Sequence, residues 1–272
     1  MIEFSIVGYK KRGKWGNNKF RGNCSGYLIV DLIEHFKPKS VLDPMKGSNT
    51  TQQVCRELGV KCDSFDLRNG FDILTSKLPP KKYDLIFLHP PYWNIIKYSR
   101  KKKDLSNSKT FSDYIKKLSI AIQRVSEYLS EKGIIVILVG NVRKKGRYYP
   151  IGAFIEVLFF KELKEEVIKI QYNATTLSYV GKKPPKLFFY RGRDFIPIAH
   201  EKVLVLKGFK PITWGELVVR VMKTLDKANL GEIYNSIECH PKTITNPTWK
   251  STVRRELQQN AVPIDRGIWK CI

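Results

Sequence analysis

The sequence predicts an α/β fold built on a doubly wound, mixed sheet, followed by a small, mainly helical second domain. Short apolar runs alternate with helical patterns through the first part of the chain, which is typical of a mainly parallel sheet covered on both faces. From Pro211 onwards three helical patterns follow one another. The 272 residues are enough for one large and one small domain, expected at 1–208 and 211–272.

The first domain is expected to alternate helices and strands. Gly26–Phe36 repeats apolar residues at helical spacing and stops before Lys37-Pro38. The short apolar run of Ser40–Asp43 predicts a strand, and a Gly-containing turn leads to a helix that ends near Gly59. Further strands are expected at 60–66, 83–88, 134–139, 166–172 and 202–206, with a helix over 112–129 and with the last two strands as an antiparallel edge.

The second domain is expected to be a compact unit of three helices. They are predicted at 213–225, 229–239 and 247–260, and 266–269 closes the chain in an extended form. Thr213 and Glu216 match a capping box, and Asn246 is expected to cap the third helix just before Pro247.

The charge of the chain predicts a polyanionic partner. Forty-nine Lys and Arg against twenty-five Asp and Glu leave a formal charge of +24, so nucleic acid is the expected partner. No apolar run is long enough to span a membrane, and neither a lipidation motif nor a secretory segment is evident. The five cysteines show no spacing typical of a zinc site or a disulfide framework. We therefore expect no membrane partner, no metal, and a cytoplasmic, nucleoid-associated protein.

A loop at the first strand-to-helix junction, Val41–Thr51 (VLDPMKGSNTT), has the features of a ligand site. Gly47 allows close approach of the backbone, and Asp43 at the strand end can accept a hydrogen bond from a cationic or amino group. Thr50 or Thr51 is expected to cap the helix. Asp66, at the end of the next strand, stands where an acidic residue commonly binds ribose hydroxyls.

The same string resembles the Asp-Pro-Phe-x-Gly-Ser-Gly-Thr-Thr motif of the DNA amino-methyltransferases, the family that methylates cytosine N4 or adenine N6. The resemblance implies a Rossmann-like class I methyltransferase fold and S-adenosylmethionine as cofactor. Met45 stands for the usual Phe and Asn49 for the second Gly, and Asn tolerates positive φ. Residues 21–33 resemble the family's segment that leads into this loop, and Asp72 lies where the family contacts adenine. The implied cofactor site comprises Asn23, Cys24, Asp43, Pro44, Met45, Gly47, Ser48, Asn49, Thr50, Asp66, Leu67, Asp72 and His89.

A second motif, His89-Pro90-Pro91-Tyr92, follows another strand and resembles the family's Asp/Asn/Ser-Pro-Pro-Tyr catalytic motif. In that family the first side chain and the carbonyl of the first Pro accept hydrogen bonds from the target amino group, while the Tyr stacks on the flipped base. The mapping makes His89, Pro90, Pro91 and Tyr92 the catalytic residues. Only a neutral imidazole accepts a hydrogen bond, so activity is expected to fall as the pH drops through the titration range of His89.

Residues 213–272 resemble a winged helix-turn-helix with 247–260 as the recognition helix. Lys250, Arg254, Arg255 and Arg266 are the expected DNA-binding residues, whereas Val253 and Leu257 are expected in the core. A protein-binding domain is the alternative. Within a variable basic region at about 141–200, residues 141–149 and 173–200 are further candidates for reading DNA.

Together these features predict a DNA methyltransferase that acts on the exocyclic amino group of a flipped base in duplex DNA. Cytosine N4 is slightly favoured over adenine N6, because His89, like Ser, brings no carboxylate. A restriction-modification system is the expected setting, with a cognate endonuclease acting separately. The alternatives are an RNA or protein-amide methyltransferase, and a catalytically idle DNA-binding regulator.

Overall fold

The computed structural model describes residues 2–172, 198–210, 212–238, 240–244 and 246–271. Contacts between Cα atoms divide the chain into two compact units. The first comprises residues 1–75 and 83–209, and the second residues 76–82 and 210–272.

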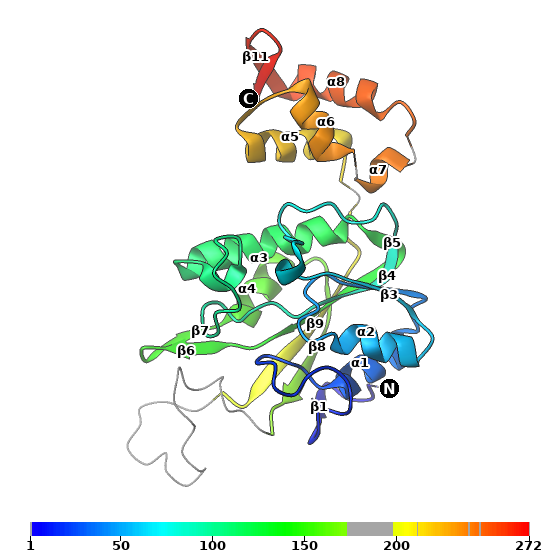
Figure 1. Ribbon diagram of the computed structural model, residues 1–272, viewed down its shortest axis with the longest axis vertical. Coiled ribbons are helices and arrows are strands. Elements are labelled where there is room, and N and C mark those ends of the chain that lie inside the picture. The colour runs from blue at the N-terminus through cyan, green and yellow to red at the C-terminus, as the bar shows by residue number, and fades with distance from the viewer. Residues whose placement is uncertain (1, 173–197, 211, 239, 245, 272) are drawn as a thin grey trace. The chain divides into compact units, whose positions relative to one another are not determined.

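The first unit is built on a seven-stranded mixed sheet (Figure 1). The strands follow the order β1-β8-β9-β5-β4-β2-β3, in which β9 runs antiparallel to both of its neighbours and every other pair is parallel. This arrangement confirms the expected Rossmann-like doubly wound fold. The strand bounds are β1 (Ile6–Gly8), β2 (Ser40–Asp43), β3 (Lys61–Ser64), β4 (Tyr83–Leu88), β5 (Leu129–Val139), β8 (Leu163–Ile170) and β9 (His200–Lys207).

Helices cover both faces of this sheet. Figure 1 shows α1 (Gly26–Phe36) and α2 (Thr50–Glu57) over one face, and α3 (Phe111–Ser126) and α4 (Ile151–Leu158) over the other. The predicted stop at Lys37 is confirmed, because this residue ends α1 in the left-handed conformation. Short 3-10 turns at Leu67–Asn69 and Leu105–Asn107 follow β3 and precede α3.

Several features of the first unit differ from the sequence prediction, including the helix α4, which was not predicted. The strand expected at 134–139 begins at Leu129, so α3 ends at Ser126 instead of 129. The antiparallel strand β9 lies inside the sheet, and β1, which the sequence did not predict, is the edge strand beside β8. Residues 142–149 form a hairpin of β6 (Val142–Lys144) and β7 (Arg147–Tyr149), too short to show a period in the sequence.

The second unit packs three helices against a small sheet. The helices are α5 (Trp214–Leu225), α6 (Leu230–Ile237) and α8 (Trp249–Asn260), with one turn, α7 (Pro241–Ile244), before the last. β10 (Lys227–Asn229), β11 (Ala261–Asp265) and β12 (Ile268–Cys271) form the sheet in the order β10-β12-β11. Val253 and Leu257 are fully buried, as predicted.

Capping residues account for the helix starts of the second unit. Thr213 and Glu216 form the predicted capping box, and Asn229 with Glu232 forms a second one. The cap predicted at Asn246 is wrong, because α8 begins at Trp249. The Asn246 side chain instead accepts a hydrogen bond from the amide of Thr248, which stabilises the turn before the helix.

None of the helices in the described part of the chain combines the length and the apolar character needed to cross a membrane.

Candidate active site

Two loops open at the same edge of the sheet in the first unit. One follows β2 and the other follows β4, and these strands are adjacent and parallel. The sheet has its switch point between β2 and β4. The chain first adds β3 on one side of β2 and then crosses over to add β4 on the other side. Doubly wound sheets bind ligands at the carboxyl ends of strands at such a switch point. A cavity of about 770 Å³ opens at this position, within the size range of small-molecule sites.

The cavity brings together nearly all of the residues that the two motifs predicted. Asn49 alone among them does not line it. It has φ of 69°, which confirms that Asn takes the left-handed conformation there, and it stands at the start of α2, where Thr50 or Thr51 was expected as the cap. The predicted residues that line the cavity are Asn23, Cys24, Asp43, Pro44, Met45, Gly47, Ser48, Thr50, Asp66, Leu67, Asp72, His89, Pro90, Pro91 and Tyr92.

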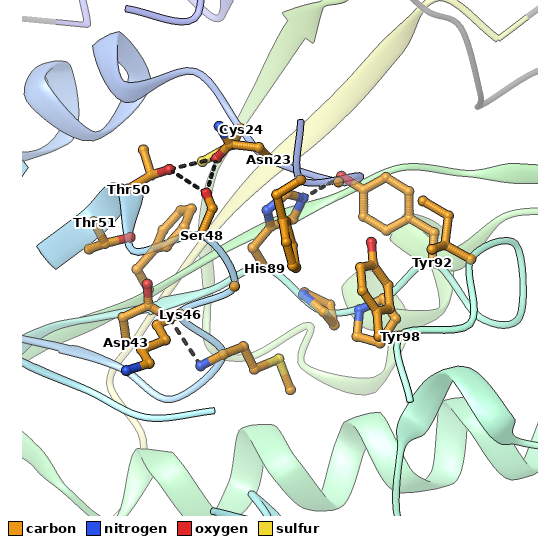
Figure 2. A pocket seen from close by; sticks show the side chains of 18 of the residues that line it. Asn23, Cys24, Asp43, Lys46, Ser48, Thr50, Thr51, His89, Tyr92 and Tyr98 are labelled. Carbon is orange, nitrogen blue, oxygen red and sulfur yellow. Dashed lines mark hydrogen bonds between the residues drawn. The ribbon is translucent and has the colours of Figure 1, made fainter. Parts of the chain in front are cut away.

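A hydrogen-bond cluster ties the segment before α1 to the loop after β2. The Oδ1 atom of Asn23 accepts hydrogen bonds from Thr50 Oγ1 at 2.6 Å and from Ser48 Oγ at 2.8 Å (Figure 2). This use of Thr50 explains why its hydroxyl does not cap α2. The cluster closes one wall of the cavity with two segments that are 27 residues apart in the chain.

Asp43 is a buried carboxyl group on the cavity wall. Burial raises its pKa to about 6, although hydrogen bonds from Thr51 and from the Met45 amide act in the opposite direction. A buried carboxylate is poorly solvated by water. A cationic ligand beside it therefore strongly stabilises its ionised form.

The two other acidic residues of the predicted site are engaged by neighbouring groups. Asp66 accepts hydrogen bonds from the Gly47 amide at 3.1 Å, and from the backbone amide and the guanidinium of Arg68. Burial alone would raise the pKa of Asp66, but these bonds outweigh it and hold the pKa below its usual range. Asp72 accepts hydrogen bonds from the Leu74 amide and the Thr75 hydroxyl.

Two side chains of the loop after β4 belong to a continuous series of hydrogen bonds. His89 Nε2 lies 3.0 Å from the Tyr92 hydroxyl (Figure 2), and that hydroxyl donates to Glu201 Oε1 at 2.5 Å. Glu201 Oε2 in turn lies 2.6 Å from Lys169 Nζ. Tyr92, predicted only as a stacking residue, therefore also links the loop after β4 to β8 and β9.

His89 is neutral at physiological pH. Burial lowers its pKa to about 4, and the nearby cations Lys169 and Arg12 add to this effect, while Glu201 opposes it. The loss of activity expected from protonation of this residue therefore moves from the ordinary range of histidine to about pH 4.

The backbone of the same loop is fixed by its neighbours. The Pro91 carbonyl accepts hydrogen bonds from the Tyr114 hydroxyl at 2.7 Å and from the Trp93 amide. Trp93 is buried with φ of 50°, and its indole donates to the Ser108 carbonyl. Among the described residues none donates to the Pro90 carbonyl, which is the acceptor that the motif predicted.

Several residues that line the cavity were not predicted from the sequence. Tyr98 and Phe20 stack at 5.9 Å and both line it. Lys169 and Glu201 also line it, and a signal for them was present in the sequence. Side chains alternate between the two faces of a strand, so Lys169 lies on the same face of β8 as the buried Val167, and Glu201 on the same face of β9 as the buried Val203. A charged residue in the otherwise apolar inward row of each strand is that signal.

The predicted DNA-binding residues of the second unit are exposed on α8 and on the turn between β11 and β12. The residues are Lys250, Arg254, Arg255 and Arg266. Arg254 Nε donates to the Tyr234 hydroxyl at 2.7 Å, and Arg255 pairs with Glu256. In the first unit, Lys145 and Arg147 are exposed on the β6–β7 hairpin. Most of the candidate segment 173–200 lies outside the described residues.

Comparison with known proteins gives distant structural neighbours. No family model matches the chain, and no curated protein matches its sequence. A candidate DNA modification methylase of Thermus thermophilus, solved with S-adenosyl-L-methionine, has 17% identity and a TM-score of 0.32, over 68% of this chain and 63% of its own. A Thermoplasma acidophilum protein has 15% identity and a TM-score of 0.40, over 71% and 93%. Human N-acetylserotonin methyltransferase has 11% identity and a TM-score of 0.37, over 68% and 52%. The chain thus spans less than two thirds of the first and third of these proteins.

Proposed function

We propose that this chain is an S-adenosylmethionine-dependent methyltransferase that modifies the exocyclic amino group of a base in duplex DNA. One observation is the main support for this proposal. The Gly47 loop and the His89-Pro90-Pro91-Tyr92 corner line one cavity at the switch point of the sheet, so that a donor held by the first loop lies next to acceptors on the second.

The residues of the first loop fit the proposed cofactor. Asp43 is a buried carboxylate that would pair with a cationic group, and S-adenosylmethionine carries both a sulfonium and an ammonium. Gly47, with its positive φ, lines the cavity, and Asp66, two residues after β3 ends, is the acidic residue proposed to bind the ribose hydroxyls. When bound, the cofactor supplies an electrophilic methyl group.

The residues of the second loop account for activation of the amino group. The lone pair of a base amino nitrogen is delocalised into the ring, so the nitrogen becomes a nucleophile only when acceptors hold its hydrogens. The Pro90 carbonyl and the neutral imidazole of His89 supply two such acceptors. The rigid Pro-Pro segment holds both in place, and positioning then provides most of the rate enhancement.

Charge supports DNA as the substrate. Five exposed cations are among the residues that line the cavity, and they would attract the phosphates on either side of a flipped nucleotide, although Lys14 also pairs with Glu57 and Lys103 with Asp72. They are Lys10, Lys11, Arg12, Lys14 and Lys103. The second unit adds exposed Lys and Arg on α8, in keeping with its proposed winged-helix role. We keep cytosine N4 as the favoured target, because the cavity offers an imidazole where adenine-specific enzymes of the family place a carboxylate or an amide. A restriction-modification role is also proposed, on the resemblance of the two loop motifs to those of the DNA amino-methyltransferases.

Transfer of a labelled methyl group to duplex DNA tests the proposal. The purified chain should label DNA in the presence of S-adenosylmethionine, and sequencing of modified bases in DNA from cells that express it should identify the base. His89→Ala should abolish transfer, and calorimetry on the same variant shows how much of that loss comes from weaker cofactor binding. Cofactor binding without label in DNA would favour an idle regulator, and label in RNA alone would overturn the choice of substrate.

A further inference from the structure

Lys169 and Glu201 form a buried ion pair across two strands. They face each other in the register of β8 and β9, and each side chain is less than one tenth exposed. Removing two charges from water costs about as much as their attraction returns, so such a pair is weak evidence of a stabilising role. Its place on the cavity wall, next to the catalytic loop, indicates a different use.

The Tyr92 hydroxyl carries a single proton. This proton sets which groups donate and which accept in the series of hydrogen bonds from Glu201 to His89. Burial pushes the pKa of Glu201 upwards, but Lys169, His89 and the hydrogen bond from Tyr92 bring it below its usual range, so the carboxylate is ionised and only accepts. The one proton of Tyr92 therefore lies toward Glu201 Oε1. The hydroxyl oxygen can only accept from His89, and Nε2 must carry the imidazole proton.

We propose that Glu201, held by Lys169, is a positioning residue that acts through Tyr92 to keep His89 in the Nε2–H form, so that Nδ1 offers its lone pair to the amino group of the target base. The inference rests on the proposed function. No described residue donates to Nδ1, and His89 lines the cavity. The opposite tautomer would present an N–H to the amino group and repel it. The catalytic motif of the family uses an amide, hydroxyl or carboxylate oxygen, which needs no such control, whereas a histidine does.

The charged and titratable groups around His89 come from four segments. They are Arg12 on the N-terminal loop, Tyr92 on the catalytic loop, Lys169 on β8 and Glu201 on β9. Lys169 and Arg12 disfavour protonation of the His89 ring. Removal of the Glu201 charge therefore leaves the ring neutral, and its only effect on the ring is to remove the constraint on the tautomer.

Nitrogen NMR of the full chain, labelled with ¹⁵N-histidine, reads the tautomer directly and needs no substrate. The chain has four histidines, and the resonances lost in His89→Asn assign His89. We expect a protonated Nε2 and an unprotonated Nδ1 at neutral pH. Glu201→Gln and Tyr92→Phe should each give a mixture of the two tautomers. Tyr92→Phe keeps the Lys169–Glu201 pair, so it tests the inference even if Glu201→Gln does not fold.

A matched control removes a similar ion pair on the opposite side of the same strand. Lys202 follows Glu201 in β9 and pairs with Glu156 at 2.6 Å, so Glu156→Gln should leave the His89 resonances and the methyl transfer unchanged. In the wild-type chain, a proton on Nδ1 would overturn the inference. So would an unchanged tautomer in both Glu201→Gln and Tyr92→Phe.

Kinetics separate positioning from a merely structural role. Glu201→Gln should lower kcat roughly tenfold to a hundredfold, the range known for residues that orient a metal-binding histidine, with little change in KM for S-adenosylmethionine. In a His89→Asn background, where an amide oxygen is the acceptor, the same change should have a much smaller effect. If the wild-type chain transfers no methyl group, the proposed function fails while the NMR result still decides the tautomer.

Discussion

Arg68 occupies the hydrogen-bonding positions of Asp66. Its backbone amide and Nε donate to Asp66 Oδ1 at 2.8 and 2.7 Å, and its guanidinium also reaches Oδ2 at 3.1 Å and lies over the ring of Phe20. With the Gly47 amide on Oδ2, the carboxylate has no acceptor position left for ribose hydroxyls. If Asp66 binds the ribose of the proposed cofactor, that cofactor has to displace the Arg68 side chain.

This competition predicts that Arg68→Ala tightens cofactor binding. The Arg68 side chain is 43% exposed, and such an ion pair contributes about 1 kcal/mol at most, so we expect up to about a fivefold decrease in the Kd for S-adenosylmethionine. Isothermal calorimetry measures it, with Asp66→Asn as the companion variant that should weaken binding. Weaker binding in Arg68→Ala would mean that the guanidinium contacts the cofactor.

The buried carboxyl of Asp43 predicts a conflict between stability and binding. Its folded pKa of about 6 lies above the ordinary value of 3.8, so ionisation opposes folding, and the opposition grows as the pH rises from 3.8 to about 6. Asp43→Asn should increase the free energy of unfolding at pH 8 by about 2–3 kcal/mol. The gain should vanish by about pH 3, where the carboxyl is largely neutral in both states. Urea unfolding at the two pH values measures the difference.

The same variant should bind S-adenosylmethionine poorly at every pH. In the wild-type chain, cofactor affinity should decrease below about pH 6, because the protonated carboxyl no longer attracts a cation. Asp43→Asn should lose this pH dependence. A wild-type affinity that stays constant between pH 8 and pH 5 would remove Asp43 from the cation site.

The depressed pKa of His89 predicts a flat pH profile for the chemical step. With cofactor and DNA saturating, kcat should stay constant through the ordinary titration range of histidine and decrease only toward about pH 4, where the ring gains a proton. The decrease in affinity attributed to Asp43 affects KM, which separates the two groups. A midpoint near pH 6.5 in kcat would mean that the ring is not buried in the working enzyme.

The exposed face of α8 predicts a salt-dependent contribution to DNA binding. Arg254→Ala should weaken binding to duplex DNA and reduce the slope of log K against log salt by about 1 if the side chain contacts one phosphate. Lys223→Ala, on the exposed side of α5, serves as the matched control and should change neither quantity. Fluorescence anisotropy over a salt series measures both. Equal effects of the two variants would indicate general attraction in place of a contact through α8.

The sequence by itself determined most of the strands and helices and the meeting of the two loops, but neither the strand order nor the elements β1 and α4. The periodicity of Gly26–Phe36 and the apolar run of Tyr83–Leu88 are local properties, and both elements formed with these bounds. Parallel strands end at one edge of a sheet, so motifs after β2 and β4 had to share the cavity. The positive φ of Asn49 is likewise a local property of its residue type.

Only the tertiary structure decided the state of the side chains in the cavity. Tyr92 and Glu201 are 109 residues apart, and their hydrogen bond depends on β9 turning antiparallel beside β8. The pKa values of Asp43 and His89 follow from burial, which packing of the whole unit sets. The desolvation of a side chain depends on which distant residues exclude water from it, and a long-range hydrogen bond depends on which distant residue is brought beside it. The order of residues along the sequence does not contain that information.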